Sequence, residues 1–481
     1  MQVRAVLLAI GVMTMLIGAA MLPSAAVDFA EGREEWPIFA LSAFGSIFIG
    51  TCLYVMSRGE TPRTGPREAF LLVVLVWLIL PAIAAIPFVA SGMSITNAVF
   101  ESVSGLTTTG ATVVTGLDDR PQGFLLWRAI LQWIGGIGII VTAIAILPTL
   151  RVGGMQLFQI ESTDVSGKFL PRVTEIATQT GFVYLFLTAL CAILYNFNGM
   201  EPFDAIAHAM TTMAAGGFST TDSSFMGETN GAVSVAILFM ILAGLPFAAF
   251  VMMARGQWDA LWRDPQPRLF LAILIAAIAL LMVYDSGAGT AGYSEFGESL
   301  RQTAFNVVSV MTGTGYASAD YNAWGPGAVM LFLILMFFGG CAGSAACGIK
   351  IFRIEIAAKT IVSYARRMVR PNRLAPVRYS GKIVSEDTQQ SVMVFIFLYL
   401  ATFFISAALL ALTGLDAITA ISGAATSVSN VGPGLGDTIG PTGTFQTLPV
   451  AAKWICAVAM LLGRLEFVAI FVLMTRRFWR D

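Results

Sequence analysis

The segment from Asn97 to Thr112 reads NAVFESVSGLTTTGAT, and it lies between two long apolar runs, Phe70 to Ala90 and Phe124 to Leu150. The segment is too short to cross a bilayer, because a spanning helix needs about 20 apolar residues. It ends in a stretch of threonine, glycine and alanine, Thr108 to Thr112. This arrangement predicts a re-entrant hairpin: a membrane helix, a half-length helix, a glycine-containing loop and a second membrane helix.

The same plan returns three times along the chain. DAIAHAMTTMAAGGFST begins at Asp204, TAFNVVSVMTGTGYAS begins at Thr303, and DAITAISGAATSVSNVGPGLG begins at Asp416. Each copy again lies between apolar runs that are long enough to cross a membrane as helices. Four such hairpins placed around one axis predict a cation pore.

The composition is that of a polytopic helical membrane protein. Of the 481 residues, 57% are hydrophobic and 12% are charged, against about 25% charged in an average soluble domain. The formal net charge of −1 argues against nucleic acid as a partner. Five scattered cysteines do not suggest a disulfide framework. The apolar run from Val6 to Leu22 could be a signal peptide, but the topology below favours a retained helix.

The apolar runs predict an all-α protein with ten transmembrane helices and four re-entrant half-helices. The helices Val6 to Leu22 and Trp36 to Met56 form a pair outside the repeats, because no glycine loop lies between them. The other outer helices are expected at Thr180–Phe197, Val233–Ala254, Leu269–Tyr284, Val329–Phe352, Val392–Leu412 and Ala451–Met474. The predicted divisions are a two-helix extension at 1–66 and pore repeats at 67–152, 153–256, 257–365 (with a gate loop) and 366–481 (with a short cytoplasmic C-terminus).

Lysine and arginine collect in the cytoplasmic loops of membrane proteins. The two termini and the alternate loops 57–68, 151–172, 255–268 and 350–382 hold 22 of the 28 basic residues. Both termini are therefore predicted to be cytoplasmic, and the glycine loops to open on the opposite side. The long charged stretch from Arg353 to Asp387 is interpreted as a loop contacting anionic headgroups, with a docking surface for a cytosolic partner as the alternative.

Glycines recur at one position of the four units. Alignment without gaps superposes Gly110, Gly217 and Gly315, and a short insertion in the fourth unit brings Gly432 to the same place. A half-helix of about 12 residues is about 18 Å long, so its negative C-terminal end favours a cation near mid-membrane. Glycine permits the backbone angles with which loop carbonyl oxygens replace the water shell of an ion. The predicted filter segments are Thr108 to Thr112, Ala215 to Ser219, Gly313 to Ala317 and Asn430 to Gly434.

The residues expected to form the filter itself share these segments. They are Thr108, Thr109, Gly110, Ala111, Ala215, Gly216, Gly217, Phe218, Thr314, Gly315, Tyr316, Asn430, Val431, Gly432 and Pro433. The alternative is that the glycines only allow close helix packing, as small residues often do in membranes. Four glycines in register between paired apolar runs favour the filter.

Polar residues of the half-helices also align. Glu101, His208 and Asn306 share one register. Asp204 and Asp416 stand where helix N-caps belong, as does Thr96 or Asn97 in the first unit. Simple capping is the plainer interpretation, although Asp204, Asp416 and Glu101 could also concentrate cations near the mouth. His208 has no second ligand nearby in the sequence, which favours packing or hydrogen bonding over metal binding.

Longer motifs around the hairpins identify a family. These motifs are LLWRAILQWIGGIGII after the first half-helix, GGFST in the second unit, GGCAGSAACGIKI in the third, and NVGPGLG with LLGRLEF in the fourth. In combination, and over nearly the whole chain, they resemble the TrkH branch of the Trk/Ktr/HKT potassium transporter superfamily. The extra first helix pair fits that branch rather than the shorter Ktr members.

The resemblance implies potassium uptake across a bacterial inner membrane by a multi-pass protein without a covalent cofactor. It also implies a homodimer, with one pore in each protomer, docked on a cytosolic nucleotide-binding regulatory ring of the TrkA type. Carried onto this sequence, it implies potassium sites at Thr109, Gly110, Gly216, Gly217, Thr314, Gly315, Val431 and Gly432.

The second outer helix of the third repeat is interrupted by GGCAGSAACG, Gly339 to Gly348. Each glycine costs about 1 kcal/mol inside a helix, so four of them should unwind or hinge it. The resemblance makes this stretch an intramembrane loop that blocks the pore beneath the filter, although Ala345, Ala346 and Cys347 replace part of a more glycine-rich run. The alternative is a packing face of small residues. The predicted gate residues are Gly339, Gly340, Gly343, Ser344, Gly348, Lys350 and Arg464.

Arg464 lies near the middle of the last predicted membrane helix, where an ionisable group is a functional candidate. The resemblance places it in the pore below the filter, where its charge would limit cation dwell and could pair with the gate loop; a plain interhelical ion pair is the alternative. Lys350 is either a cytoplasmic anchor or a partner of the gate. Arg128, Gln132 and Trp133 are interpreted as an interface anchor and helix contacts rather than as part of the ion path.

The sequence thus predicts a potassium-conducting protein with a channel-like filter and no catalytic role. A sodium-permeable or cation-coupled symporter of the same fold is the alternative within transport, because no segment carries a complete TVGYG motif. A polytopic membrane enzyme or receptor is the alternative from another class. It would require a polar catalytic cluster inside the helices, and the sequence does not show one.

Overall fold

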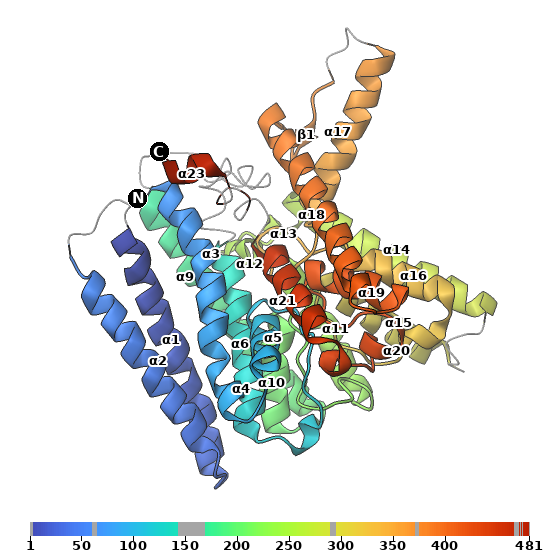
Figure 1. The fold of residues 1–481 in the computed structure, drawn as a ribbon. Coiled ribbons are helices and arrows are strands. Elements are labelled where there is room, and N and C mark those ends of the chain that lie inside the picture. Colours follow the sequence, from blue (N-terminus) through green and yellow to red (C-terminus); the bar gives the residue numbers. More distant parts are fainter. Residues whose placement is uncertain are drawn as a thin grey trace.

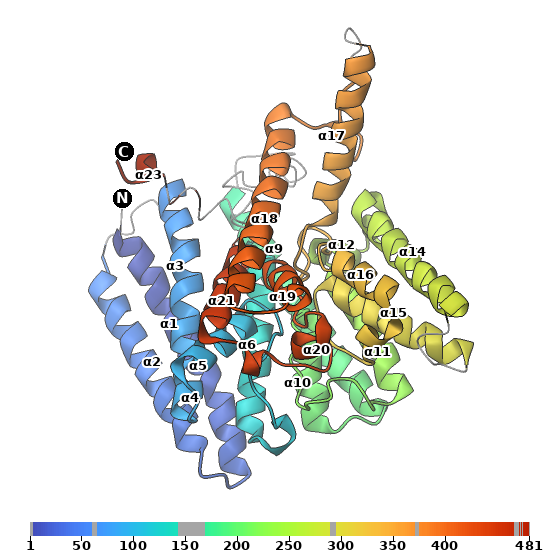
Figure 2. The same ribbon diagram turned by 45° about the vertical axis from the view of Figure 1, so that its right-hand side comes forward.

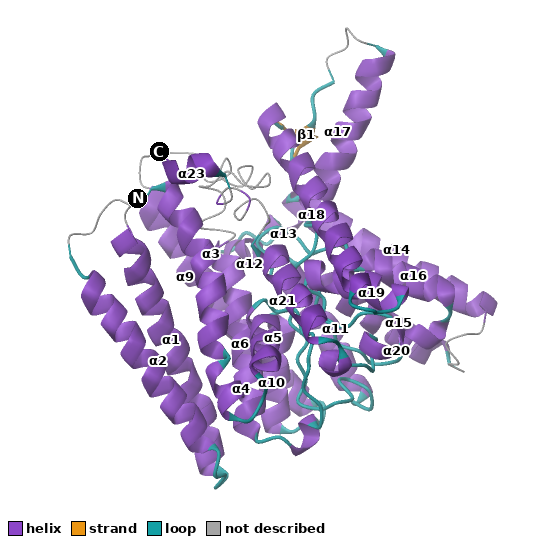
Figure 3. Cartoon of the chain, in the orientation of Figure 1, coloured by secondary structure: helices purple, strands orange, loops and turns teal. Residues whose placement is uncertain are grey.

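The computed structural model describes residues 3–59, 65–142, 169–288, 295–370, 375–465, 471, 473 and 475–480. Helices dominate this part of the chain, as the all-α prediction requires (Figure 3). The two described strands, β1 (Arg378–Tyr379) and β2 (Lys382–Ile383), form one antiparallel hairpin in which Arg378 lies opposite Ile383.

The N-terminal helices α1 (Val3–Ala30) and α2 (Trp36–Ser57) form a long pair along one side of the molecule (Figure 1). Gly11 and Gly50 face each other: a Cβ built on Gly50 would lie 2.7 Å from the carbonyl oxygen of Gly11. The pair is tied to the pore repeats by Asp28, whose Oδ1 accepts a 2.7 Å hydrogen bond from the main-chain N–H of Gly123.

Each of the four repeats contains a half-helix between its outer helices. The first repeat contains α3 (Pro66–Ala84), α4 (Ile86–Ala90), α5 (Ile95–Leu106), η1 (Leu117–Asp119) and α6 (Gln122–Val141). The second contains α9 (Phe169–Phe197), α10 (Pro202–Met213), α11 (Asn230–Gly244) and α12 (Phe247–Ala254), followed by α13 (Ala260–Arg263).

The last two repeats follow the same order. The third repeat contains α14 (Pro265–Ala288), α15 (Phe296–Thr312), η3 (Tyr321–Trp324), α16 (Pro326–Leu335) and α17 (Ile351–Val369). The fourth contains α18 (Glu386–Leu412), α19 (Ala417–Ser429), α20 (Gly436–Ile439), η4 (Phe445–Thr447) and α21 (Val450–Arg464), and α23 (Arg476–Arg480) follows it.

Of the ten predicted crossings, eight correspond to apolar helices of membrane-spanning length in the described residues, counting one bent pair as a single span. Seven spans in the described residues are long and apolar enough to cross a membrane, and α11 with α12 makes an eighth that bends by 94°. The other two predicted crossings correspond to α16 with α17 and to α21, beyond which residues 466–470 lie outside the described part. Both termini lie at the end of the molecule from which α17 projects (Figures 1 and 2).

Several local predictions were wrong. The helix expected from Val233 to Ala254 is broken before Phe247, because Pro246 has no N–H to continue the helical ladder. The third half-helix has 17 residues rather than about 12, so Thr303 lies within it. The position of the first N-cap also differs: Ser94, not Thr96 or Asn97, accepts the hydrogen bond from the Asn97 N–H.

Of the two predicted acidic N-caps, one is confirmed and the other is wrong. Asp416 caps α19 by accepting a 3.1 Å hydrogen bond from the Thr419 N–H, as predicted. Hydrogen bonds from Thr419 also hold the pKa of the Asp416 carboxyl below its ordinary value. Asp204 instead lies in the first turn of α10, where the positive end of the helix still favours a carboxylate, and Glu201 occupies the N-cap position.

The close approach of α1 and α2 predicts an effect of side-chain size at Gly50. Replacement Gly50→Leu places a Cβ against the Gly11 carbonyl and should destabilise the protein by about 1–3 kcal/mol, as overpacking does. The melting temperature of the detergent-solubilised protein measures this. Gly45→Leu, on the same helix with open space around its Cβ, is the control and should melt like the wild type. Equal melting of both variants would contradict the packing argument.

Candidate functional site

The four half-helices end in the same backbone pattern. A residue in the left-handed region follows each helix, and a left-handed glycine comes two residues later. The first residues are Thr108, Ala215, Gly313 and Asn430, with φ between 50° and 75°. The glycines are Gly110, Gly217, Gly315 and Gly432, with φ between 78° and 112°. The repeat that the sequence alignment indicated is therefore also a repeat of backbone conformation.

The four glycines close a ring. A Cβ built on each glycine would lie under 3.0 Å from a carbonyl oxygen of the next segment, closer than real Cβ atoms approach. The contacts run from Gly110 to the Gly216 oxygen, from Gly217 to Thr314, from Gly315 to Val431 and from Gly432 back to Thr109. This cyclic order places the four segments around one centre and leaves no room for a Cβ at the four glycines.

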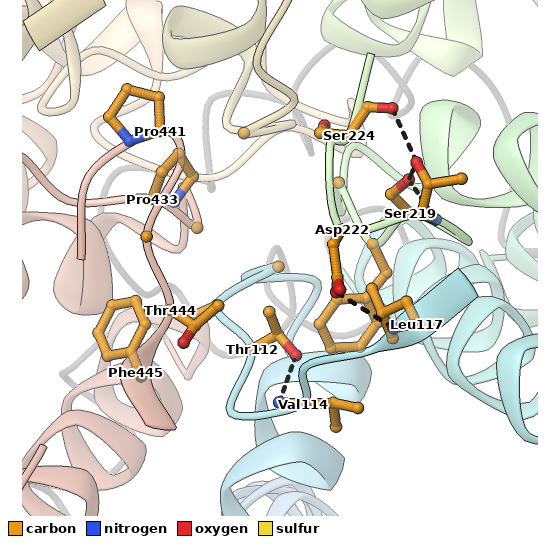
Figure 4. A pocket seen from close by; sticks show the side chains of 18 of the residues that line it. Thr112, Val114, Leu117, Ser219, Asp222, Ser224, Pro433, Pro441, Thr444 and Phe445 are labelled. Atoms are coloured by element: carbon orange, nitrogen blue, oxygen red, sulfur yellow. Dashed lines mark hydrogen bonds between the residues drawn. The ribbon is translucent and has the colours of Figure 1, made fainter. Parts of the chain in front are cut away.

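A cavity of about 70 Å³ opens on one side of the ring. All four glycines border it, and polar groups of the outer loops complete its wall (Figure 4). Asp222 is one of these groups, and its carboxylate accepts hydrogen bonds from the N–H groups of Gly116 (2.8 Å) and Leu117 (3.2 Å). The ring is thus accessible from a small vestibule lined by both polar and apolar residues.

One polar side chain of each half-helix holds the chain that leaves the ring. Glu101 accepts from the Thr112 hydroxyl (2.9 Å) and the Val113 N–H (3.0 Å). His208 Nε2 pairs with the Ser219 hydroxyl at 3.1 Å, and Asn306 accepts from the Ser318 N–H at 3.2 Å. In the fourth repeat Ser422 takes this role, accepting from the Leu435 N–H at 2.9 Å. The shared register of Glu101, His208 and Asn306 therefore marks a common brace.

The sequence left open that Glu101 concentrates cations near the mouth, and the structure contradicts this. Its side chain is fully buried and forms a 2.8 Å ion pair with Arg128, which is also buried. Arg128 further donates to the Ser219 carbonyl (2.8 Å) and the Thr112 hydroxyl (3.2 Å), and its guanidinium lies 4.1 Å from the centre of the Phe218 ring. Arg128 is thus not an interface anchor but a clamp between the first and second segments.

The other seams of the ring are held by different groups. The Tyr316 hydroxyl contacts Thr211 and donates to the His208 carbonyl (3.2 Å), which joins the third segment to the second half-helix. The Asn430 amide donates to the Thr109 hydroxyl (2.8 Å), which joins the fourth segment to the first. The backbone is fourfold, but the side chains that fix it are not.

The predicted gate stretch forms a compact loop between α16 and α17. The helix ends at Leu335, four residues before the first glycine, because residues 336–338 already turn away. Phe338 and Ile349 then pair in a parallel bridge, and the Gly339 N–H donates to the Ile349 carbonyl at 2.9 Å. Gly343 and Gly348 have φ of 73° and 72°, conformations that favour glycine.

The tip of this loop lies beneath the ring. The Cys347 sulfur is 3.8 Å from the Thr108 hydroxyl, and a Cβ built on Gly313 would lie 3.5 Å from the Cys347 nitrogen. Thr108 and Gly313 are the residues that open the first and third segments. Arg464 also reaches this point, donating to the Cys347 sulfur and to the Gly135 carbonyl at 3.0 Å. The loop, the ring and Arg464 therefore meet at one place.

Comparison with known proteins gives one consistent result. The family model TrkH, described as cation transport protein, matches residues 37–480. The potassium uptake protein TrkI of Halomonas elongata is 43% identical over 95% of this chain and 92% of its own length. TrkH of Escherichia coli K12 is 35% identical over the full length of both chains. The crystal structure of the potassium transporter TrkH from Vibrio parahaemolyticus superposes with a TM-score of 0.91 at 32% identity, covering both chains fully.

This chain belongs to the TrkH family. The resemblance inferred from the motifs is confirmed, as are the all-α repeat architecture and the assignment to a multi-pass membrane protein. Members of the TrkH family in this comparison are named as transport proteins, so the chain is a transporter rather than an enzyme. The alternative of a membrane enzyme or receptor is set aside.

Lys350 contacts the loop from Gly339 to Gly348 in this TrkH-family chain. Its ammonium reaches the Ser344 carbonyl and hydroxyl, both at 3.4 Å, and the Ala346 carbonyl. Ser344 in turn donates to the Cys341 carbonyl at 2.7 Å. Of the two interpretations that the sequence left open for Lys350, these contacts favour the partner of the loop.

Sequence reasoning did not place Arg128 or Gln132 at the TrkH-family site and did not name Ser422. A signal existed for the first two, because an arginine and a glutamine one helical turn apart stand in an otherwise apolar run. Buried polar groups in such a run need partners. Their partners in the second segment are 84 to 91 residues away in the sequence, so the pattern alone could not name them.

The buried pair predicts a strong dependence of stability on charge balance. Arg128→Met leaves the Glu101 carboxylate buried without its counter-ion and should cost about 3–5 kcal/mol of stability. Combining it with Glu101→Gln removes the stranded charge and should recover much of that loss, which thermal unfolding of the purified protein measures. Arg120→Met, at an exposed position, is the control. A double variant no more stable than Arg128→Met alone would contradict this account.

Proposed function

We propose that this protein takes up potassium across the inner membrane of a bacterium through the ring of four segments. The observation that carries the proposal is the cyclic contact of Gly110, Gly217, Gly315 and Gly432 with carbonyl oxygens of the neighbouring segments. The related proteins of Halomonas elongata and Escherichia coli are named as potassium uptake proteins, which supports the choice of ion.

The ring offers main-chain oxygens to a dehydrated cation. Thr109, Gly216, Thr314 and Val431 supply the carbonyls next to the glycines, and the glycine carbonyls supply a second layer. Each half-helix directs its partial negative end toward this point, which favours a cation there. Exchange of water for a set of carbonyl oxygens is the way potassium filters compensate dehydration.

The loop from Gly339 to Gly348 acts as the gate in this proposal. Cys347 lies under the opening residues of two segments, so an ion leaving the ring meets the loop next. Arg464 and Lys350 place two positive charges against the loop. These charges disfavour a resting cation beneath the ring, and release of their hydrogen bonds would let the loop move aside.

The distribution of basic residues and the family support a proposed orientation, oligomeric state and partner for this pore. The termini and α17 are cytoplasmic, and the vestibule faces outward, because the basic loops collect on the side of the termini. The chain works as a homodimer with a pore in each protomer. A cytosolic ring of the TrkA type docks on the basic stretch that includes α17 and regulates the gate.

The proposal predicts that Gly315 tolerates no side chain. Gly315→Ala places a Cβ against the Val431 carbonyl and penalises the left-handed backbone, so potassium uptake should fall at least about tenfold. Growth at limiting potassium of a bacterial strain lacking its own uptake systems, and flux into proteoliposomes, measure this.

Gly297→Ala is the matched control, because Gly297 lies in the first turn of α15, the half-helix that precedes the Gly315 segment, with open space around it. Both variants must be present in the membrane at wild-type amounts. Wild-type uptake by Gly315→Ala would refute the ring as the ion path. Repeating the flux assay with sodium separates the proposed potassium path from a sodium-permeable or sodium-coupled protein of the same fold.

The proposed gate predicts that loss of the Arg464 side chain raises potassium flux. Arg464→Ala removes the hydrogen bonds to Cys347 and Gly135 and the charge below the ring, so potassium flux through the protein alone should rise. A rise of at least about tenfold is expected, since a hydrogen bond to a charged group contributes about 1.5–3 kcal/mol. Arg464→Lys keeps the charge and loses the forked donor, so it separates the two contributions. Unchanged flux in well-folded Arg464→Ala protein would contradict the gate.

A further inference from the structure

Gln132 of α6 contacts the second segment at two main-chain groups. Its amide Nε2 donates a 2.6 Å hydrogen bond to the Gly216 carbonyl, and its Oε1 accepts a 3.0 Å hydrogen bond from the Phe218 N–H. The side chain is fully buried. The amide therefore bridges Gly217 and fixes the peptide groups on both sides of it.

This contact makes one carbonyl of the ring unlike the other three. Gly216 supplies the oxygen beside Gly110, and Thr109, Thr314 and Val431 supply the equivalent oxygens. Among the residues that the structure describes, no side chain donates a hydrogen bond to those three oxygens. A carbonyl oxygen has two lone pairs, so Gly216 keeps one for an ion while Gln132 holds the other.

Gln132 also explains why the second segment has two glycines in succession. A Cβ built on Gly216 would lie within 3.0 Å of the Gln132 amide, whereas the equivalent positions hold Thr109, Thr314 and Val431. Space for Gln132, rather than ring closure, is thus the reason for Gly216. The absence of a side chain at Gly216 leaves room for the Gln132 amide to reach the backbone.

We propose that Gln132 is a positioning residue that sets the discrimination between potassium and smaller cations at the ring, an inference that rests on the proposed function. A smaller ion requires the carbonyls to close in on it. The Gln132 amide holds the Gly216 oxygen from behind, and Arg128, one turn earlier on α6, holds the Ser219 carbonyl of the same segment. The second segment therefore resists contraction, and a smaller ion loses more of its coordination than potassium does.

The test is the ratio of potassium to sodium flux in proteoliposomes that contain the full chain. Gln132→Leu keeps approximately the size of the side chain and removes both hydrogen bonds, so the ratio should fall about three- to tenfold. Potassium flux itself should persist. Trp133→Phe is the control, because it removes a half-buried hydrogen bond from α6 to Thr188 without touching the second segment, and its ratio should equal that of the wild type.

The outcomes separate this inference from the proposed function. A wild-type protein without potassium-selective flux would overturn both, whereas a selective wild type with an unchanged ratio in Gln132→Leu would overturn only the role of Gln132. A purely structural role would lower the amount of protein and the maximal flux but leave the ratio unchanged. Should Gln132→Leu fail to reach the membrane, Gln132→Glu decides by the same ratio, since it keeps the acceptor for Phe218 and alters the donor to Gly216.

Discussion

The contact between each left-handed glycine and a carbonyl oxygen of the next segment is the constraint on which the site depends. It forces the backbone out of helical geometry in the interior of a membrane protein, where unpaired peptide groups are costly. Side chains must then replace the helical hydrogen bonds. Glu101 does so for Val113, Asn306 for Ser318 and Gln132 for Phe218, which is why buried polar side chains stand on the half-helices and on α6 beside the segments.

A fourfold backbone held by unequal side chains is the general feature of this structure. A carboxylate, an imidazole, an amide and a hydroxyl perform the same brace in the four repeats. A buried ion pair is described at only one of these braces, and its arginine also donates to the Ser219 carbonyl of the second repeat. Four segments in one chain can diverge in this way, because each needs to preserve only its own backbone path and its contact with the next segment.

The sequence predicts the parts of this fold that depend on local chemistry. Hydropathy places the crossings, and glycine marks the left-handed positions because other residues rarely adopt them. The register of Gly432 was recoverable for that reason despite the insertion. The roles of Arg128 and Gln132 were not, since they depend on which helix packs against which segment. The bend before Phe247 also depends on a distant partner, the Gly343 carbonyl, which accepts from its N–H at 3.1 Å.

The bend between α11 and α12 and the loop from Gly339 to Gly348 supply hydrogen-bond partners for each other's main-chain groups. The end of α11 leaves the carbonyls of Ala243 and Gly244 without helical donors. The loop supplies the N–H groups of Ala345 (3.1 Å) and Cys341 (2.9 Å) to them. Two interruptions in neighbouring repeats thereby form one hydrogen-bonded unit inside the protein. Movement of the loop must carry the α11–α12 junction with it or provide new partners for these carbonyls, so the two breaks behave as a single element.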